Sequence, residues 1–241
     1  MVPICNPIRA HTQLQRQKAR SSAKRTLKLP NLTGAKMICH RWKTLFIHIP
    51  KTGGQSIEQV FLDKMGLDWA SRGPLLLTTN HDPEAGPPFL AHLTAGEYLS
   101  KGHLAPIDFN DYFRFTVVRN PWDRAVSEYK YRYAREMDFR DFILTAYPAP
   151  EGSNEERHLM PQWSFVHDEN GQSLVDHIIR FEDGSRQFAE ISMRIFGESI
   201  ALPHVNQSPD RRPYRKFYDA ETREAIASRY QSDIAWLGYE F

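Results

Sequence analysis

The sequence is poor in cysteine and has no long apolar segment. Only two of the 241 residues are cysteines, Cys5 and Cys39, which is too few for a disulfide framework or a cysteine-based metal site. No run approaches the ~18 apolar residues of a transmembrane helix, and no apolar signal segment stands near the N-terminus. We therefore expect a soluble chain without a transmembrane segment, in a reducing compartment such as the cytoplasm.

Acidic residues are missing from the first part of the chain. Residues 1–43 contain ten lysines and arginines and no aspartate or glutamate, whereas the whole chain has a formal net charge of only +2. We predict a basic, disordered N-terminal tail over residues 1–43 and a folded domain over residues 44–241. Alternative roles for the tail are contact with an acidic polysaccharide, a membrane surface or nucleic acid, and organelle import. It matches no folded nucleic-acid-binding module, so we expect no specific nucleic-acid partner.

Apolar runs alternate with helical patterns through the rest of the chain, which is long enough for one well-buried domain. The pattern predicts buried strands over residues 44–49, 112–118 and 175–181. It predicts helices over 121–135, 185–196 and 219–234, loops over 66–88 and 101–110, and irregular structure over 160–171. Strands that alternate with helices are typical of parallel sheets. The predicted fold is a single α/β domain, in which a P-loop-like parallel β-sheet is flanked by helices.

The segment that follows the first predicted strand has the composition of an anion-binding loop. Pro50 ends the strand, and Lys51, Thr52, Gly53, Gly54, Gln55 and Ser56 lead into a helical pattern. A glycine pair at a strand-to-helix turn lets backbone N–H groups approach a ligand closely. The free N–H groups of the new helix then favour an anion such as phosphate. A tight turn with a solvated lysine is the alternative interpretation.

A second anion site is predicted after the second strand. Arg119 follows that strand, Asn120 is a good helix N-cap, and Pro121 suits the first helical position. Ser127 lies eight residues after Arg119, about two helical turns into the helix, and can return to the side that Arg119 occupies. A guanidinium and a hydroxyl that converge in this way can bind phosphate. The alternatives are a surface salt bridge for Arg119 and a solvent-facing serine.

These motifs resemble those of sulfotransferases that use 3′-phosphoadenosine-5′-phosphosulfate (PAPS). The order Pro-Lys-Thr-Gly-Gly-x-Ser after a strand resembles their 5′-phosphosulfate loop, and FTVVRNPWDRAVSEY resembles their 3′-phosphate element. The segments HLTAGEY, VDHIIRFED, LPHVNQS and YQSDIAWLGYEF follow the family pattern in order. The resemblance is greatest to carbohydrate sulfotransferases related to heparan sulfate 2-O-sulfotransferase, and it covers residues 43–241. Gln55, where Thr or Ser is usual, and Gly184, where Leu is common, depart from the pattern.

The resemblance implies transfer of a sulfuryl group from PAPS to a hydroxyl or amine, with a carbohydrate as the expected acceptor. Lys51 would stabilise charge on the leaving adenosine 3′,5′-bisphosphate. The donor-binding residues would be Lys51, Thr52, Gly53, Gly54, Gln55, Ser56, Arg119 and Ser127. A sulfuryl group carries only one negative charge, and the sequence has no carboxylate cluster that demands a divalent metal, so we expect none to be required.

The resemblance also places the catalytic base at His92, in HLTAGEY, where the apolar run before it predicts a short strand that ends at His92. An imidazole near its ordinary pKa suits proton abstraction at neutral pH. His48, His81 and His103 remain candidates, and so does Glu58.

Two other classes of function compete with this interpretation. A kinase of nucleotides or small molecules would need a lysine after the glycines and a metal-binding aspartate at a strand end, and neither is present. A non-catalytic nucleotide-binding protein is the third possibility, and the presence of Lys51, Arg119 and Ser127 together argues against it.

Overall fold

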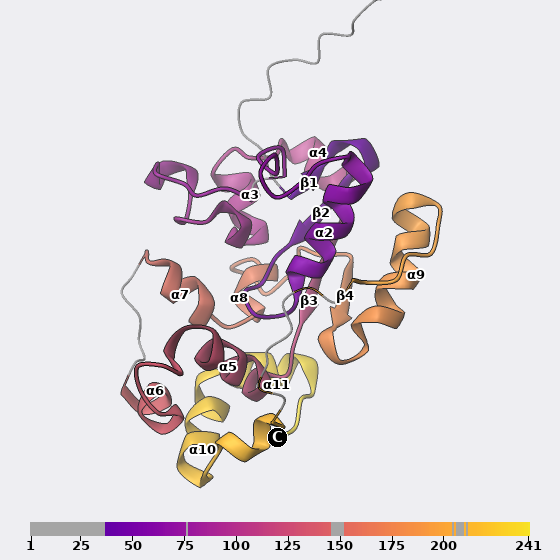
Figure 1. Cartoon of the computed structure of the whole chain (residues 1–241). Coiled ribbons are helices and arrows are strands. Elements are labelled where there is room, and N and C mark those ends of the chain that lie inside the picture. The colour runs from indigo at the N-terminus through magenta and orange to yellow at the C-terminus, as the bar shows by residue number, and fades with distance from the viewer. Residues whose placement is uncertain (1–36, 76, 146–151, 204, 206–209, 211) are drawn as a thin grey trace, which may run out of the picture. The chain divides into compact units, whose positions relative to one another are not determined.

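The computed structural model describes residues 37–75, 77–145, 152–203, 205, 210 and 212–241 (Figure 1). Residues 1–36 of the predicted basic tail lie outside the described residues, and so does part of the LPHVNQS segment. The last residues of the predicted tail do have regular structure. Met37 is buried, and β1 (Ile38–Cys39) and a 3-10 turn (His40–Trp42) follow it. A strand of two residues in a basic stretch has no periodicity that the sequence could reveal.

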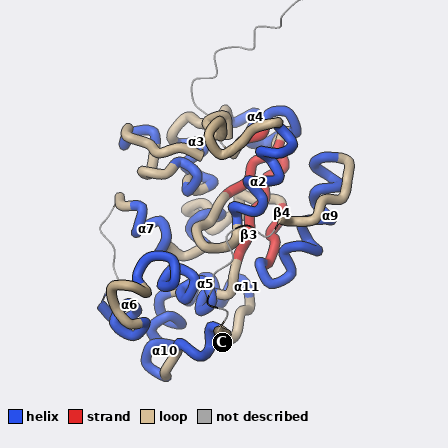
Figure 2. The backbone as a smooth tube through the Cα atoms, viewed as in Figure 1, coloured by secondary structure: helices blue, strands red, loops and turns tan. Residues whose placement is uncertain are grey.

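Four strands form one sheet in the order β1–β2–β3–β4. The strands after β1 are β2 (Thr44–Ile47), β3 (Phe113–Val118) and β4 (His177–Arg180). They pair in parallel, with Phe46 opposite Phe115 and Val117 opposite Ile179, whereas β1 pairs antiparallel with β2. Figure 2 shows these short strands gathered among the helices. The predicted α/β domain with a mainly parallel sheet is therefore confirmed.

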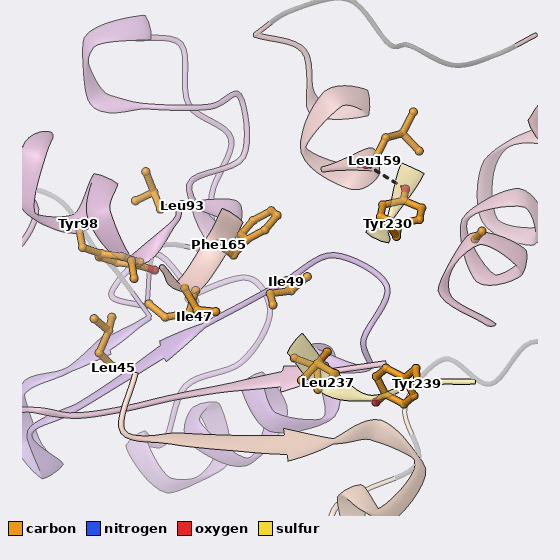
Figure 3. Close-up of a cluster of buried hydrophobic side chains, with 14 of the residues drawn as sticks. Leu45, Ile47, Ile49, Leu93, Tyr98, Leu159, Phe165, Tyr230, Leu237 and Tyr239 are labelled. Carbon is orange, nitrogen blue, oxygen red and sulfur yellow. Dashed lines mark hydrogen bonds between the residues drawn. The ribbon is translucent and has the colours of Figure 1, made fainter. Parts of the chain in front are cut away.

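The two faces of the sheet are covered by different helices. On one face, α2 (Gly54–Met65) and α9 (Gly184–Phe196) pack against Phe46, Phe115 and Ile179. The opposite face carries Leu45 and Ile47, because successive strand residues point to opposite sides. Figure 3 shows Leu45, Ile47 and Ile49 packed with side chains from several other elements. Those elements include α3 (Ala95–Ser100), α5 (Pro121–Glu128), α8 (Trp163–Val166) and α11 (Gln231–Leu237).

Several elements differ from the sequence prediction. The prediction of a loop over 101–110 is wrong, since α4 (Pro106–Asp111) begins there. This short helix buries a single residue, Phe109, so the sequence has no helical periodicity of apolar residues there. The residues before His92 form a 3-10 turn (Leu90–His92), not a strand. The predicted irregular stretch over 160–171 contains α8.

Two predicted helices are each divided in the structure. The helix predicted over 121–135 is α5 followed by a π-helical turn (Tyr129–Tyr133). The helix predicted over 219–234 is α10 (Ala220–Arg229) and α11, and Tyr230 lies between them. The Tyr230 side chain is buried and its hydroxyl donates to the Leu159 carbonyl (Figure 3). This tertiary contact fixes the break and has no local sequence signal.

The carboxyl ends of the three parallel strands meet at one edge of the sheet. The Lys51 loop follows β2, Arg119 follows β3, and Phe181 follows β4. Ligands of parallel α/β sheets bind at this edge, where loops and helix N-termini gather. The sheet therefore places both predicted anion-binding segments on the same side of the domain.

Candidate active site

A cavity of about 1320 Å³ opens at this edge of the sheet. It is lined by the predicted donor-binding residues Lys51, Thr52, Gly53, Gly54, Gln55, Ser56, Arg119 and Ser127, and also by His48, Glu58, His92 and His158. Two candidate bases lie elsewhere: His81 is exposed and His103 contacts the Ala85 carbonyl, and neither lines the cavity. The structure thus brings together Lys51, His92 and all the predicted donor-binding residues, although they come from separate segments of the chain.

The glycines of the loop are required by close contacts. Gly53 has φ 85°, a conformation that L-residues rarely adopt, and a Cβ there would lie 2.8 Å from the Phe181 ring. A Cβ on Gly54 would lie 2.4 Å from the His48 ring. Glycine at both positions lets the backbone turn directly from β2 into the N-terminus of α2. The N-terminus of α2, whose dipole favours an anion, is thereby placed at the cavity.

Lys51 occupies a strained position at the start of the loop. Its φ is 68°, in the left-handed region that non-glycine residues seldom use. Its ammonium lies 3.7 Å from the centroid of the Tyr131 ring, in cation–π contact. Burial lowers the pKa of Lys51 to about 8; the negative charge of Glu128 opposes that shift, whereas the positive charges of Arg119 and Arg132 add to it. Lys51 is therefore a poorly solvated cation at the cavity wall.

Arg119 is fixed through both its backbone and its side chain. Its Nε donates to Asp123 at 2.8 Å and its Nη1 to the Lys51 carbonyl at 3.2 Å, and its guanidinium lies 4.2 Å from the Phe181 ring centroid. The buried Gln162 side chain binds both the N–H and the carbonyl of Arg119. Arg119 is thus pre-positioned beside the loop, with guanidinium donors left for an anion.

Ser127 lies on α5 and lines the same cavity as Arg119. The predicted N-cap of this helix is present: the Asn120 side-chain oxygen accepts from the N–H groups of Trp122 and Asp123. Glu182, after β4, accepts from the Asn120 N–H and from the Tyr239 hydroxyl, so the C-terminal segment also supports this junction. The helix start is therefore well determined, which fixes where Ser127 faces.

Three buried histidines that line the cavity stand in a row, and one of them, His48, lies against Gly54 of the loop. The ring centroids of His48 and His92 are 5.4 Å apart, and those of His92 and His158 are 5.1 Å apart, both edge to face. His48 Nδ1 is 2.5 Å from Glu58 Oε1, and His158 Nδ1 is 2.7 Å from Glu128 Oε2. We call these three side chains the histidine row. Its two outer members are paired with buried carboxylates, and its central member is not.

The central histidine, His92, has a neutral partner. Its Nδ1 lies 3.2 Å from the Asn154 side-chain oxygen, at the start of α7 (Asn154–Leu159). Burial lowers the pKa of His92 well below its usual value, and the nearby His48, His158 and Arg157 lower it further. Burial likewise lowers the pKa of His158, although Glu128 opposes the shift. His92 is therefore uncharged at neutral pH.

Sequence reasoning missed several residues that line or support the site, among them His158, Glu128 and Arg124. His158 and Glu128 could not be predicted as site residues, because they lie on two helices far apart in the sequence, α7 and α5, and meet only in the folded chain. Arg124 is buried, and its guanidinium donates to the carbonyls of Pro50, His158 and Met160. It therefore ties the anion loop to the segment that carries His158. An arginine on the inner side of an amphipathic helix was the available signal.

The described residues offer no metal site that meets a simple geometric requirement. Among these residues, no group of three or more His, Cys, Asp or Glu side chains, the histidine row included, is arranged to hold a metal ion. None of the described helices has both the length and the apolar character that crossing a bilayer requires.

Comparison with known proteins gives one match over nearly the whole chain. The model of the sulfotransferase family matches residues 36–240, which include the anion loop, Arg119, Ser127 and the histidine row. A search of curated proteins finds none that matches. The match begins within a few residues of β1 and ends one residue before the C-terminus, so it spans the entire described fold. The chain belongs to the sulfotransferase family.

Proposed function

We propose that the chain transfers a sulfuryl group from PAPS to a hydroxyl or amine of an acceptor, and that the acceptor is a carbohydrate. One observation carries the proposal: the anion loop, the Arg119–Ser127 pair and the histidine row all line one cavity. Membership of the sulfotransferase family supports sulfuryl transfer as the reaction class. PAPS as the donor and a carbohydrate as the acceptor are proposed from the side chains that line the cavity.

The donor would bind across the carboxyl edge of the sheet. The start of α2 suits the 5′-phosphate, because a helix N-terminus carries a partial positive charge that favours an anion. Arg119 and Ser127 suit the 3′-phosphate, which distinguishes this donor from ATP. In the transition state, Lys51 would stabilise the negative charge that develops on the oxygen bridging the 5′-phosphate and the sulfur.

The acceptor would react from the side of the histidine row. His92 takes the proton of the acceptor hydroxyl while the oxygen attacks sulfur in line with the leaving group. The bond between sulfur and the bridging oxygen breaks, and adenosine 3′,5′-bisphosphate leaves. The products are the sulfated acceptor, adenosine 3′,5′-bisphosphate and one proton on His92, so charge and atoms balance.

The walls beside His92 support a sugar as the acceptor. Phe89 and Tyr131 are exposed aromatic residues that line the cavity, and their rings lie 6.1 Å from those of His92 and His158, respectively. Exposed aromatic faces of this kind offer apolar contact to the flat C–H faces of a pyranose while its hydroxyls remain free. The carboxylates Glu58 and Glu128 are buried and contact His48 and His158, respectively.

A ligand-stabilisation experiment tests the donor. Adenosine 3′,5′-bisphosphate should raise the melting temperature of the protein, whereas adenosine 5′-monophosphate should raise it far less and ATP with magnesium should not match it. Sulfuryl transfer from labelled PAPS should then be measured over glycans, phenols and amines. Stabilisation by ATP with magnesium alone would favour a kinase, and no response to any nucleotide would favour a non-catalytic role.

A further inference from the structure

The three members of the histidine row differ in the group that their Nδ1 atom contacts. The outer two, His48 and His158, contact carboxylates, Glu58 and Glu128. The central one, His92, contacts a neutral amide oxygen. All three rings are buried. A neutral imidazole has one N–H and one bare nitrogen, so the group at Nδ1 decides which nitrogen is free to accept a proton.

We propose that Asn154 is a positioning residue, whose side-chain oxygen accepts the Nδ1–H of His92 and so leaves Nε2 unprotonated to take the acceptor's proton. The assignment of Nε2 as the base rests on the proposed function, whereas the tautomer itself does not. The His92 ring has only one hydrogen-bonding neighbour among the described residues, and that neighbour is the Asn154 oxygen at 3.2 Å. A carbonyl oxygen can only accept, so Nδ1 must donate.

The orientation of the amide distinguishes this arrangement from its opposite. With the amide turned round, the Asn154 NH₂ group would donate to Nδ1, and the proton of the neutral ring would sit on Nε2. That ring could not act as a base through Nε2. In the structure it is the Asn154 oxygen that lies 3.2 Å from His92 Nδ1. The two orientations therefore predict different tautomers and different activity.

An amide also orients the ring without giving it a charge. A carboxylate at Nδ1 favours imidazolium, as Glu128 does for His158. The titratable groups around His92 are His48, His158 and Arg157, and each of them lowers its pKa, whereas the hydrogen bond with Asn154 opposes that shift without adding a charge. With a neutral partner, His92 stays unprotonated before the donor binds. The negative charge of a bound donor then increases its basicity when the proton has to be taken.

The tautomer can be read directly by NMR of protein with ¹⁵N-labelled histidine, without donor, at pH 7. Two-bond nitrogen–proton correlations distinguish Nδ1–H from Nε2–H, and the His92 signals are those that disappear in His92→Gln. We expect Nδ1–H in the wild type and in Asn154→Asp, with the His92 titration moved to higher pH in Asn154→Asp. In Asn154→Ala we expect a measurable population of Nε2–H.

Activity measurements complete the test. Asn154→Ala should lower kcat by roughly 10²-fold, since a histidine base in the wrong tautomer costs up to about 10⁴ in serine hydrolases. Asn154→Asp should retain more activity and move the acidic limb of kcat to higher pH. Asn110→Asp is the matched control, because it adds the same charge at an exposed asparagine that does not line this cavity.

Two results would overturn the inference. One is a wild-type His92 with its proton on Nε2. The other is an Asn154→Ala variant with wild-type tautomer and wild-type pH profile. A wild-type protein that has the Nδ1–H tautomer but transfers no sulfuryl group would instead contradict the proposed function and support the role of Asn154 in fixing the ring.

Discussion

The anion loop and the histidine row line one cavity, but their charged groups are arranged in opposite ways. At the loop, the cations Lys51 and Arg119 face the cavity, and Asp123 pairs with Arg119 from the side. In the histidine row, the carboxylates Glu58 and Glu128 are buried, and each contacts the Nδ1 atom of a histidine. Under the proposed function, the loop would hold the anionic donor, and His92, whose pKa is lowered by burial, would accept the proton.

The two sides also differ in how they are built. The loop is one continuous segment, and its shape depends on glycines that fit against His48 and Phe181. The histidine row is assembled from the end of β2, a 3-10 turn and α7. Arg124 joins the two, because its guanidinium binds the carbonyls of Pro50 and His158. We therefore expect substitutions in the loop and in the histidine row to affect donor binding and proton transfer separately.

The largest expected effect is that of His92→Ala, which should lower kcat by roughly 10²–10⁴, the usual worth of a general base. Burial holds the pKa of His92 below its usual value in the donor-free protein, and a base must be neutral. As the pH is lowered, kcat/KM should therefore fall only below that lowered pKa. The fall of kcat on the acidic side should occur at higher pH than that of kcat/KM, because the negative charge of the bound donor raises the pKa of His92.

Donor affinity should hardly change in His92→Ala, and calorimetry with adenosine 3′,5′-bisphosphate measures this. His81→Ala is the control, since His81 is exposed and does not line the cavity. If His48→Ala or His158→Ala abolishes the acidic limb while His92→Ala keeps it, the base lies in an outer member of the row.

Lys51→Ala should lower kcat by about 10²–10³ at saturating donor, because it removes the group that stabilises charge on the leaving oxygen. The acidic limb should keep its position, since the histidine row is intact. Steady-state kinetics with saturating PAPS measure both quantities. Turnover within a few fold of wild type would show that Lys51 does not stabilise the leaving group.

The loop side could be predicted from the sequence because its information is local. The glycine pair after a strand, and the cap at Asn120 after another, are patterns within a few residues. The requirement for glycine at position 54 could not be predicted, because it arises from contact with the His48 ring. Likewise His158 meets Glu128 only through the packing of α5 against α7, and their sequence positions carry no sign of it.

Arg119→Ala should weaken binding of adenosine 3′,5′-bisphosphate by about 1.5–3 kcal/mol, the worth of a charge-assisted contact. The preference over adenosine 5′-monophosphate should be lost to the same extent. Ser127→Ala should act in the same direction with a smaller effect, because a neutral hydroxyl contributes less than a guanidinium. Calorimetry with both nucleotides decides this, and an unchanged preference in Arg119→Ala would exclude Arg119 as the 3′-phosphate ligand.

The smallest expected effect is a pH dependence of donor affinity that belongs to the loop side alone. The pKa of Lys51 lies at about 8, so its ammonium is mostly charged at pH 7 and mostly neutral at pH 9. An anionic donor favours the charged form of Lys51. Above pH 8, where Lys51 is mostly neutral in the free protein, donor binding must therefore be accompanied by uptake of a proton. Affinity for adenosine 3′,5′-bisphosphate should fall between pH 8 and 9, by up to about tenfold per unit.

Calorimetry in two buffers with different ionisation enthalpies should reveal the proton uptake at pH 8.5. Lys51→Arg is the control, because a guanidinium stays charged over this range and should give a flat affinity. His92 and His158 should contribute nothing here, because their pKa values are lowered and both rings are already neutral. The same decline in Lys51→Arg as in the wild type would place the titrating group elsewhere in the cavity and remove the contrast between its two sides.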